Sequence, residues 1–179
     1  MRATGVVRRI DDLGRIVIPK EIRRTMRMKE GDPLEIFTEN SGEIVLKKYS
    51  MMTQLSDSSR NYADSLYKVS GLSCAVCDTD SVVAFGGPGR KDALGCAITG
   101  DMEGIISSRM SYFRQFPGEK SIYSHRGARA SVVGATPIIS SGDCAGVVAL
   151  LGEDGRVLTE TQKKLLVLTA TLIAGNLES

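Results

Sequence analysis

The chain has little of what most catalytic and metal sites are built from. Among its 179 residues there is a single histidine, His125. One histidine cannot supply a multi-histidine metal site, and a Ser-His-Asp triad would have to depend on this residue alone. We expect His125 instead to lie on a solvated loop beside Arg126 and Arg129. The composition therefore predicts neither a catalytic centre nor a metal site.

Long hydrophobic runs are also missing. A helix that crosses a bilayer needs roughly 20 consecutive apolar residues, whereas the run between Gly146 and Gly152 is short and is bounded by glycine. The first five residues, Met1-Arg2-Ala3-Thr4-Gly5, lack the apolar core of a signal peptide. We therefore expect a cytoplasmic chain with no membrane partner.

Cysteines are few and unevenly spaced, at positions 74, 77, 96 and 144. A chain of this length does not need disulfides for stability, so we expect reduced thiols. Cys74 and Cys77 have the C-x-x-C spacing of redox pairs and of half zinc sites. Their segment, however, has the pattern of a strand, on which side chains three residues apart point to opposite faces. We expect both to be small buried residues.

The small net charge of +2 conceals a segregated distribution. Residues 1–29 contain nine Lys and Arg residues against three acidic ones, whereas residues 30–50 contain two against five. Seven of the first 27 residues are arginine, which is favoured over lysine for planar contacts with phosphates and guanine edges. Such a cluster indicates a nucleic-acid partner, although charge alone leaves a solvated basic face as an equal alternative.

The first fifty residues have the pattern of short strands separated by turns. Strands are predicted at 6–10 and 15–18 around a turn at 11–14, and at 34–37 and 44–47 around a turn at 40–42. Pro19 begins a predicted helix over roughly residues 19–28. Ile22 and Met26 share an apolar face of that helix. Its basic residues share a second face: Lys20, Arg23, Arg24 and Arg27.

This module is too small to be stable alone. Four short strands and one short helix bury too little surface to offset the chain entropy of folding. We expect it to dimerise through shared strands, which also matches a two-fold DNA site.

The remaining residues predict a larger α/β pattern. Strands are expected at 73–78, 82–86, 131–139 and 144–151, with helices at 53–69, at about 98–114 and at 160–177. Gly86-Gly87-Pro88-Gly89 superficially resembles a phosphate-binding loop. It is followed by Arg90-Lys91-Asp92 rather than by Gly-Lys-Ser/Thr, so we expect a surface loop near a pocket.

Two of these helices are predicted to meet other subunits. The last helix begins at a capping box formed by Thr159 and Gln162 and is apolar almost all round, although one sheet covers only one side. The helix at 53–69 carries a narrow stripe of apolar residues spaced three or four positions apart, as in a heptad repeat. We therefore expect dimers to pair into a tetramer through the apolar residues of the two helices: Leu55, Tyr62, Leu66, Val69, Leu165 and Leu172.

The N-terminal residues closely resemble the AbrB family of bacterial transition-state regulators. The match runs from Thr4 through Pro19 to Thr25 and from Gly31 to Ile36, and so covers about residues 1–50. The resemblance implies that residues 1–52 form a β-barrel-like dimer of swapped hairpins that binds double-stranded DNA. By matching positions, it implies that Arg8, Arg15, Arg23 and Arg24 contact DNA, with Arg9, Lys20 and Arg27 as accessory phosphate contacts.

Residues 53–179 resemble a GAF-like domain, which makes the fold class α+β. The resemblance lies in Cys77-Asp78-Thr79-Asp80, Arg90-Lys91-Asp92 and Gly146-Val147-Val148. The layout of the whole chain is similar to that of a sporulation regulator of spore-forming Firmicutes. It implies a sequence-specific transcription regulator of late sporulation genes in the forespore, either activating or repressing.

Several alternatives remain open at this stage. The GAF-like domain is either a sensor of an unidentified small ligand or a ligand-free oligomerisation module, and no cofactor is expected. A cysteine-dependent reductase on the same fold would need a reactive cysteine in an electropositive pocket. An antitoxin-like DNA-binding protein would carry a disordered acidic tail, whereas residues 51–179 are balanced in charge.

Overall fold

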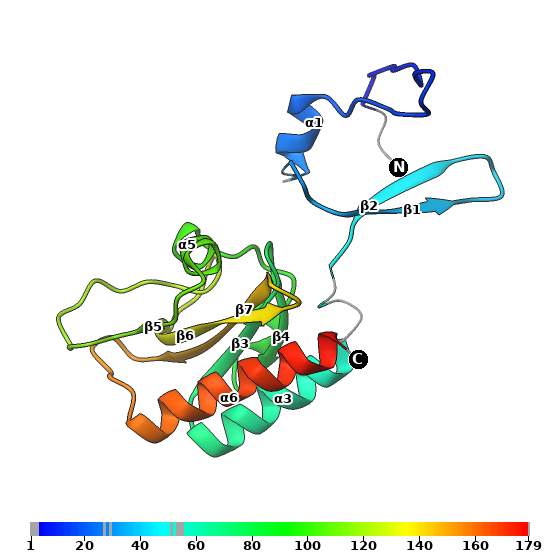
Figure 1. Cartoon of the computed structure of the whole chain (residues 1–179). Helices are drawn as coiled ribbons and strands as arrows, with labels where there is room; N and C mark the ends of the chain where they lie inside the picture. The colour runs from blue at the N-terminus through cyan, green and yellow to red at the C-terminus, as the bar shows by residue number, and fades with distance from the viewer. Residues whose placement is uncertain (1–3, 27, 29, 51, 53–55, 179) are drawn as a thin grey trace. The chain divides into compact units, whose positions relative to one another are not determined.

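The computed structural model describes residues 4–178 except 27, 29, 51 and 53–55. The chain divides into two compact units, Met1–Tyr49 and Ser50–Ser179 (Figure 1). We call them unit 1 and unit 2.

The described residues of unit 1 form one hairpin and one short helix. β1 (Leu34–Thr38) pairs antiparallel with β2 (Ile44–Lys48), with Ile36 opposite Leu46. The connecting turn includes Gly42 at φ 84°, a conformation that favours glycine. This hairpin confirms the second predicted strand pair. α1 (Lys20–Thr25) begins directly after Pro19 and is shorter than the expected helix.

The strands predicted at 6–10 and 15–18 are wrong for the single chain. Residues 4–19 contain no strand, although the turn between the two segments is present at residues 12–14. A strand needs a neighbour for its N–H and C=O groups, and the described residues of this chain provide none for these segments. Val7 and Val17 on them are 84% and 71% exposed.

Unit 2 is built on a five-stranded antiparallel sheet in the order β4-β3-β7-β6-β5. Two of the inner strands, β3 (Ser73–Cys77) and β7 (Asp143–Gly152), are largely buried. This burial explains why they are almost continuously apolar rather than alternating. Together with β4 (Val82–Gly86) and β6 (Ser131–Ser140), they confirm the four predicted strands to within two residues.

Helices cover both faces of this sheet. α3 (Ser56–Ser70) and α6 (Glu160–Leu177) lie side by side on one face, where Leu66, Leu166 and Ile173 pack in a core with Val148 (Figure 1). On the other face, α4 (Arg90–Ala93) and α5 (Gly100–Ser108) pack in a second core that includes Phe85.

The ends of the helices show where the sequence pattern was ambiguous. The helix expected over 98–114 ends at Ser108, because Arg109 adopts the left-handed conformation and its N–H donates to the Ile105 and Ile106 carbonyls. The following residues form β5 (Tyr112–Phe113), which pairs with Gly134 and Ala135. α4 was not predicted.

The capping box at the start of α6 is confirmed. The Gln162 N–H donates to Thr159 Oγ1 at 3.2 Å, and the Thr159 N–H donates to Gln162 Oε1 at 3.1 Å. These two bonds satisfy donors that the first helical turn would otherwise leave free.

Candidate nucleic-acid interface and ligand pocket

Asp11 organises a tight basic loop in unit 1. Its carboxylate accepts from the N–H groups of Leu13 and Arg15 at 3.0 and 2.8 Å and from Arg15 Nε at 2.8 Å. These bonds, the one from the Arg15 main chain first, lower the pKa of the Asp11 carboxyl. Gly14 at φ 76° allows the chain to reverse. The loop therefore holds the Nε side of the Arg15 guanidinium, while most of that side chain stays in solvent.

The other predicted DNA-contacting residues differ in exposure. Arg23 is half-buried, and its Nε is a buried donor with no partner among the described atoms. Arg27 lies outside the described residues. The rest are exposed around the loop and α1: Arg8, Arg9, Lys20 and Arg24.

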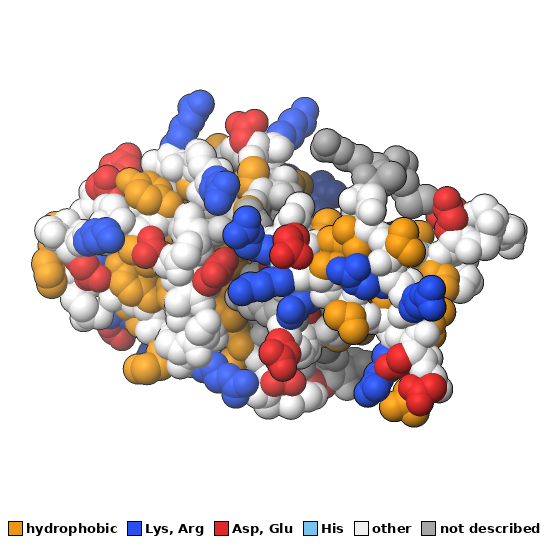
Figure 2. Space-filling model, turned by 90° about the horizontal axis from the view of Figure 1, so that it is seen from above, with side chains coloured by type: hydrophobic (Ala, Val, Ile, Leu, Met, Phe, Trp, Pro, Cys, Tyr) orange, Lys and Arg blue, Asp and Glu red, His pale blue; other side chains and the backbone are white. Residues whose placement is uncertain are grey.

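Apolar side chains are exposed on the same unit. Those on residues 6–17 include Val6, Val7, Ile10, Leu13, Ile16 and Val17. Figure 2 shows hydrophobic side chains lying at the surface among Lys and Arg side chains. Soluble monomers rarely expose contiguous apolar surface without a partner. Unit 1 therefore combines a basic surface with exposed apolar side chains on residues 6–17, a segment that pairs with no strand among the described residues.

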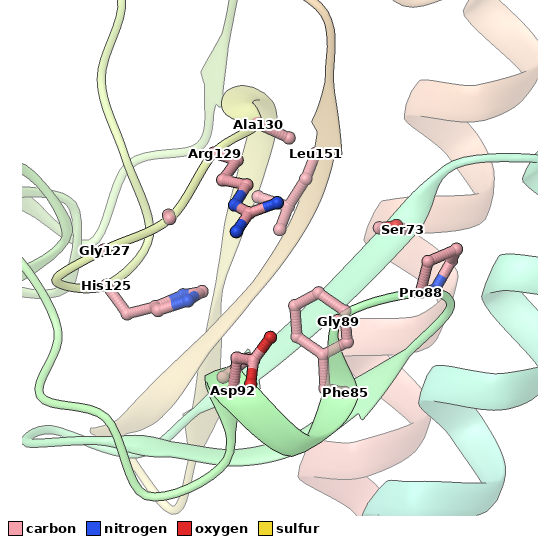
Figure 3. Close-up of a pocket in the computed structure, with 12 residues that line it drawn as sticks. Ser73, Phe85, Pro88, Gly89, Asp92, His125, Gly127, Arg129, Ala130 and Leu151 are labelled. Atoms are coloured by element: carbon pink, nitrogen blue, oxygen red, sulfur yellow. The ribbon is translucent and has the colours of Figure 1, made fainter.

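Unit 2 contains a cavity of about 250 Å³ on the α4 side of its sheet (Figure 3). Pro88 and Gly89 line it, which confirms the prediction that the glycine-rich loop lies near a pocket. Strand residues Ser73, Phe85 and Leu151 form part of its wall, and residues 127–130 close another side. Phe85 was not predicted as a pocket residue, since its role depends on the packing of the loop before β6.

His125 contradicts the prediction of a solvated position. It is 7% exposed, and its segment bridges to Ile98. Its ring packs edge-on against the Phe85 ring, with 6.3 Å between the centroids, and its Nδ1 lies 2.9 Å from Ser124 Oγ. Burial lowers the pKa of His125. The neutral ring lines the pocket together with Arg129, which is exposed as expected.

The cysteines behave as the strand pattern predicts. Cys74 and Cys77 are buried in the cores on opposite faces of the sheet. Burial raises the pKa of each thiol far above its usual range. A thiol that stays protonated is a poor nucleophile and a poor metal ligand. The described residues also contain no group of His, Cys, Asp and Glu side chains placed to hold a metal ion.

The residues predicted at a subunit interface are divided between core and surface. Leu66 lies in unit 2's own core, because its stripe faces α6 and the sheet of the same chain. Tyr62 packs against that core, and its hydroxyl accepts from Asn176 at 2.8 Å. Leu165 is half-buried, whereas Val69 and Leu172 are exposed. Leu55 lies outside the described residues.

None of the helices that the structure describes is long and apolar enough to span a bilayer.

Comparison with known proteins gives a consistent picture for both units. The family described as "Stage V sporulation protein T C-terminal, transcription factor" matches residues 54–178, and the family of the MazE bacterial antitoxin matches residues 7–54. Stage V sporulation protein T of Bacillus subtilis is 42% identical over 99% of both chains. The transition state regulatory protein AbrB of the same organism is 53% identical over 49 residues, which are 27% of this chain and 50% of that protein.

Solved structures show the fold of unit 2. The GAF domain of a phosphoenolpyruvate-protein phosphotransferase from Acinetobacter has a TM-score of 0.54 at 14% identity, covering 74% of this chain and 84% of that one. A fragment of a methyl-accepting chemotaxis protein has a TM-score of 0.55 at 18% identity, covering 69% and 88%. Unit 2 therefore has a GAF-like fold.

An AbrB-type N-terminal domain joined to a GAF-like domain defines a class of transcription regulators. The long match over the whole length is more specific than either domain alone. This chain belongs to the stage V sporulation protein T family and is a sporulation regulator. The family is one of transcription factors and not of enzymes, so the reductase alternative is dropped.

Proposed function

We propose that the chain is a sequence-specific DNA-binding regulator of late sporulation genes, acting in the forespore cytoplasm. The observation that carries this proposal is the combination on unit 1 of an exposed arginine surface with an unpaired apolar segment at 6–17. A second copy would pair that segment as strands and double the basic surface. We infer that residues 1–52 form the DNA-binding and swapped-hairpin dimerisation domain.

We assign the DNA contacts to Arg8, Arg15, Arg23 and Arg24, supported by Arg9, Lys20 and Arg27. The Asp11 carboxylate takes Arg15 Nε, which leaves the two terminal nitrogens of that guanidinium for a phosphate or a base edge. Arg24 is exposed on α1. Because a guanidinium presents its donors in a planar fork, both residues suit bidentate contacts.

Genome-wide mapping of bound sites tests the function directly. We expect the sites to share one motif and to lie upstream of genes transcribed late in sporulation. On a purified duplex that carries the motif, affinity should fall steeply with salt, since each phosphate neutralised adds about 0.9 to the log–log slope. Sites without a common motif, or an affinity indifferent to salt, would contradict the proposal.

Residues 53–179 are proposed to join two dimers into a tetramer. Leu168 and Leu172 are exposed one turn apart on α6, and Val69 is exposed near the end of α3. This apolar surface is available to a second copy, whereas the buried Leu66 is not. A folded unit 2 also argues against the antitoxin-like alternative, which would require a disordered tail.

We further propose that the pocket of unit 2 binds a small ligand that changes DNA binding. A series of contacts within unit 2 connects the pocket to Ser50, the residue that follows unit 1 in the sequence. The His125 segment bridges to Ile98, whose N–H donates to the Asp80 carbonyl at 3.0 Å. The Asp80 N–H donates to Asp78 at 2.8 Å, and Ser50 Oγ donates to the same carboxylate at 3.2 Å. Ser50 is the first residue of unit 2.

A further inference from the structure

The pocket of unit 2 contains one unpaired positive charge and one unpaired negative charge. The guanidinium of Arg129 and the carboxylate of Asp92 point into the same space, with the Phe85 and His125 rings beside it (Figure 3). Among the described residues, neither charged group has an ion-pair or hydrogen-bond partner. Arg90, the neighbouring cation on α4, is different because it binds Asp64 and the Phe85 carbonyl. The lining therefore has balanced charges that are free to bind a ligand.

His125 gives a second indication that is independent of these charges. Its ring is more than nine-tenths buried and points into the pocket (Figure 3). Nδ1 is occupied by Ser124, whereas Nε2 has no partner among the described residues. A ligand atom bonded to Nε2 would complete the hydrogen bonds of this ring without adding a charge to the pocket.

The size and walls of the pocket limit the ligand. Its volume is about 250 Å³, whereas a cavity of about 150 Å³ holds benzene and pockets for drug-sized ligands begin near 300 Å³. The space therefore suits a molecule of the size of one amino acid and is too small for a nucleotide. Phe85, Ala93, Ala130 and Leu151 supply apolar walls for a carbon skeleton.

We propose that this pocket binds a free α-amino acid. The carboxylate of the ligand would pair with Arg129, its ammonium group with Asp92, and one hydrogen bond would form with His125 Nε2. A simple carboxylic acid or a simple amine would pair with only one of the two protein charges and would therefore form one charged hydrogen bond fewer. This inference rests on the proposed ligand role of the pocket and names the class of the ligand.

The test is calorimetric titration of the full-length protein with the proteinogenic L-amino acids, one at a time. For each amino acid that binds, the same skeleton is then tested without its ammonium group and without its carboxylate. We expect the amino acid to bind about tenfold more tightly than either analogue, because each loses one charged hydrogen bond.

Paired variants assign the two contacts. Arg129→Gln should remove the preference for the amino acid over the amine, and Asp92→Asn should remove the preference over the carboxylic acid. Arg126→Gln is the matched control, because Arg126 is exposed on the same loop but does not line the pocket. It should leave both preferences unchanged.

The possible failures can be told apart. If no amino acid binds, or if the carboxylic acid binds as tightly as the amino acid, the zwitterion assignment is overturned. If the carboxylic acid binds as tightly as the amino acid, the pocket is still a ligand site. DNA affinity is measured separately, with and without a bound amino acid. An unchanged DNA affinity despite binding would refute the proposed control of DNA binding and leave the ligand class intact.

Discussion

Arg15 and Arg24 occupy different local environments although both are predicted to contact DNA. Arg15 is held by Asp11, whereas Arg24 extends from α1 into solvent. We expect Arg24→Ala to reduce DNA affinity by tenfold or more without changing the melting temperature. Arg15→Ala should reduce affinity similarly and lower the melting temperature only slightly, since exposed ion pairs contribute little to stability. Fluorescence anisotropy on a motif duplex and a circular dichroism melt measure the two effects.

Arg60→Ala is the control for this pair, because it removes the same charge from an exposed position on α3 in unit 2. It should bind DNA as the unmodified protein does. If Arg24→Ala unfolds the protein in parallel with its loss of binding, then Arg24 is a structural residue and the assignment is wrong.

His125 predicts a pH dependence of the stability of unit 2. Burial lowers its pKa below the ordinary value near 6.5. The unfolded chain then takes up a proton at a higher pH than the folded chain does. Stability is therefore complete above the unfolded pKa and falls as the pH drops through the unfolded and then the folded pKa. We expect the melting temperature to fall between neutral pH and about pH 5, and to fall less in His125→Gln.

The position of His125 also shows what the sequence could not predict at this scale. Its neighbours Ser124, Arg126 and Gly127 are polar or flexible, which is the pattern of a solvated loop. Its burial comes from Phe85 and Ile98, which are distant in the sequence. Local contacts were predictable, as at Asp11 and at Thr159, because donor and acceptor lie within four residues of each other.

At the scale of elements, the packing of α3 on β4 depends on Gly86. A Cβ at this position would overlap the Ala63 carbonyl of α3 and crowd the Tyr67 side chain. We expect Gly86→Ala to destabilise unit 2 by about 2 kcal/mol, because the backbone has to shift to relieve the overlap. Gly104→Ala is the matched substitution, since nothing lies within 4 Å of its Cβ in α5. The Gly104→Ala substitution should stabilise unit 2 by up to about 1 kcal/mol. Urea unfolding of both variants tests this contrast.

The elements differ in how far the sequence specifies them. The hairpin β1–β2 and the strands of unit 2 were predictable because their partners lie in the same chain and turn residues mark their ends. The segment at 105–113 mixes apolar residues with serines and Arg109, and this pattern does not distinguish helix from strand. Only the pairing with β6 decides that Tyr112 and Phe113 form a strand. The segments at 6–10 and 15–18 have a strand pattern but no partner strand among the described residues of the single chain, which is why they point to a second copy.

At the scale of the whole molecule, unit 1 is expected to act without unit 2. Residues 1–52 should still dimerise and bind a single DNA site, because the proposed dimer core comes from interlaced strands of the N-terminal domain. On paired sites the truncated form should bind about 10² more weakly than the full chain, since it loses the effective concentration that tethering provides. Affinity measured on single and paired sites separates these effects. A truncated form that binds paired sites as tightly as the full chain would contradict tethering.

The proposed tetramer contact is tested by one charge on α6. Leu172 is 45% exposed on the outer surface of that helix. Leu172→Glu would place a carboxylate in an apolar contact between subunits, where an unpaired charge is costly. We expect light scattering to show a dimer in place of the tetramer. The melting temperature of isolated unit 2 should be unchanged by the substitution. Leu94→Glu is the matched control, because Leu94 is 44% exposed but follows α4 on the other face of the sheet. A Leu94→Glu protein that also becomes dimeric, or a full-length protein that is already dimeric, would rule out this contact.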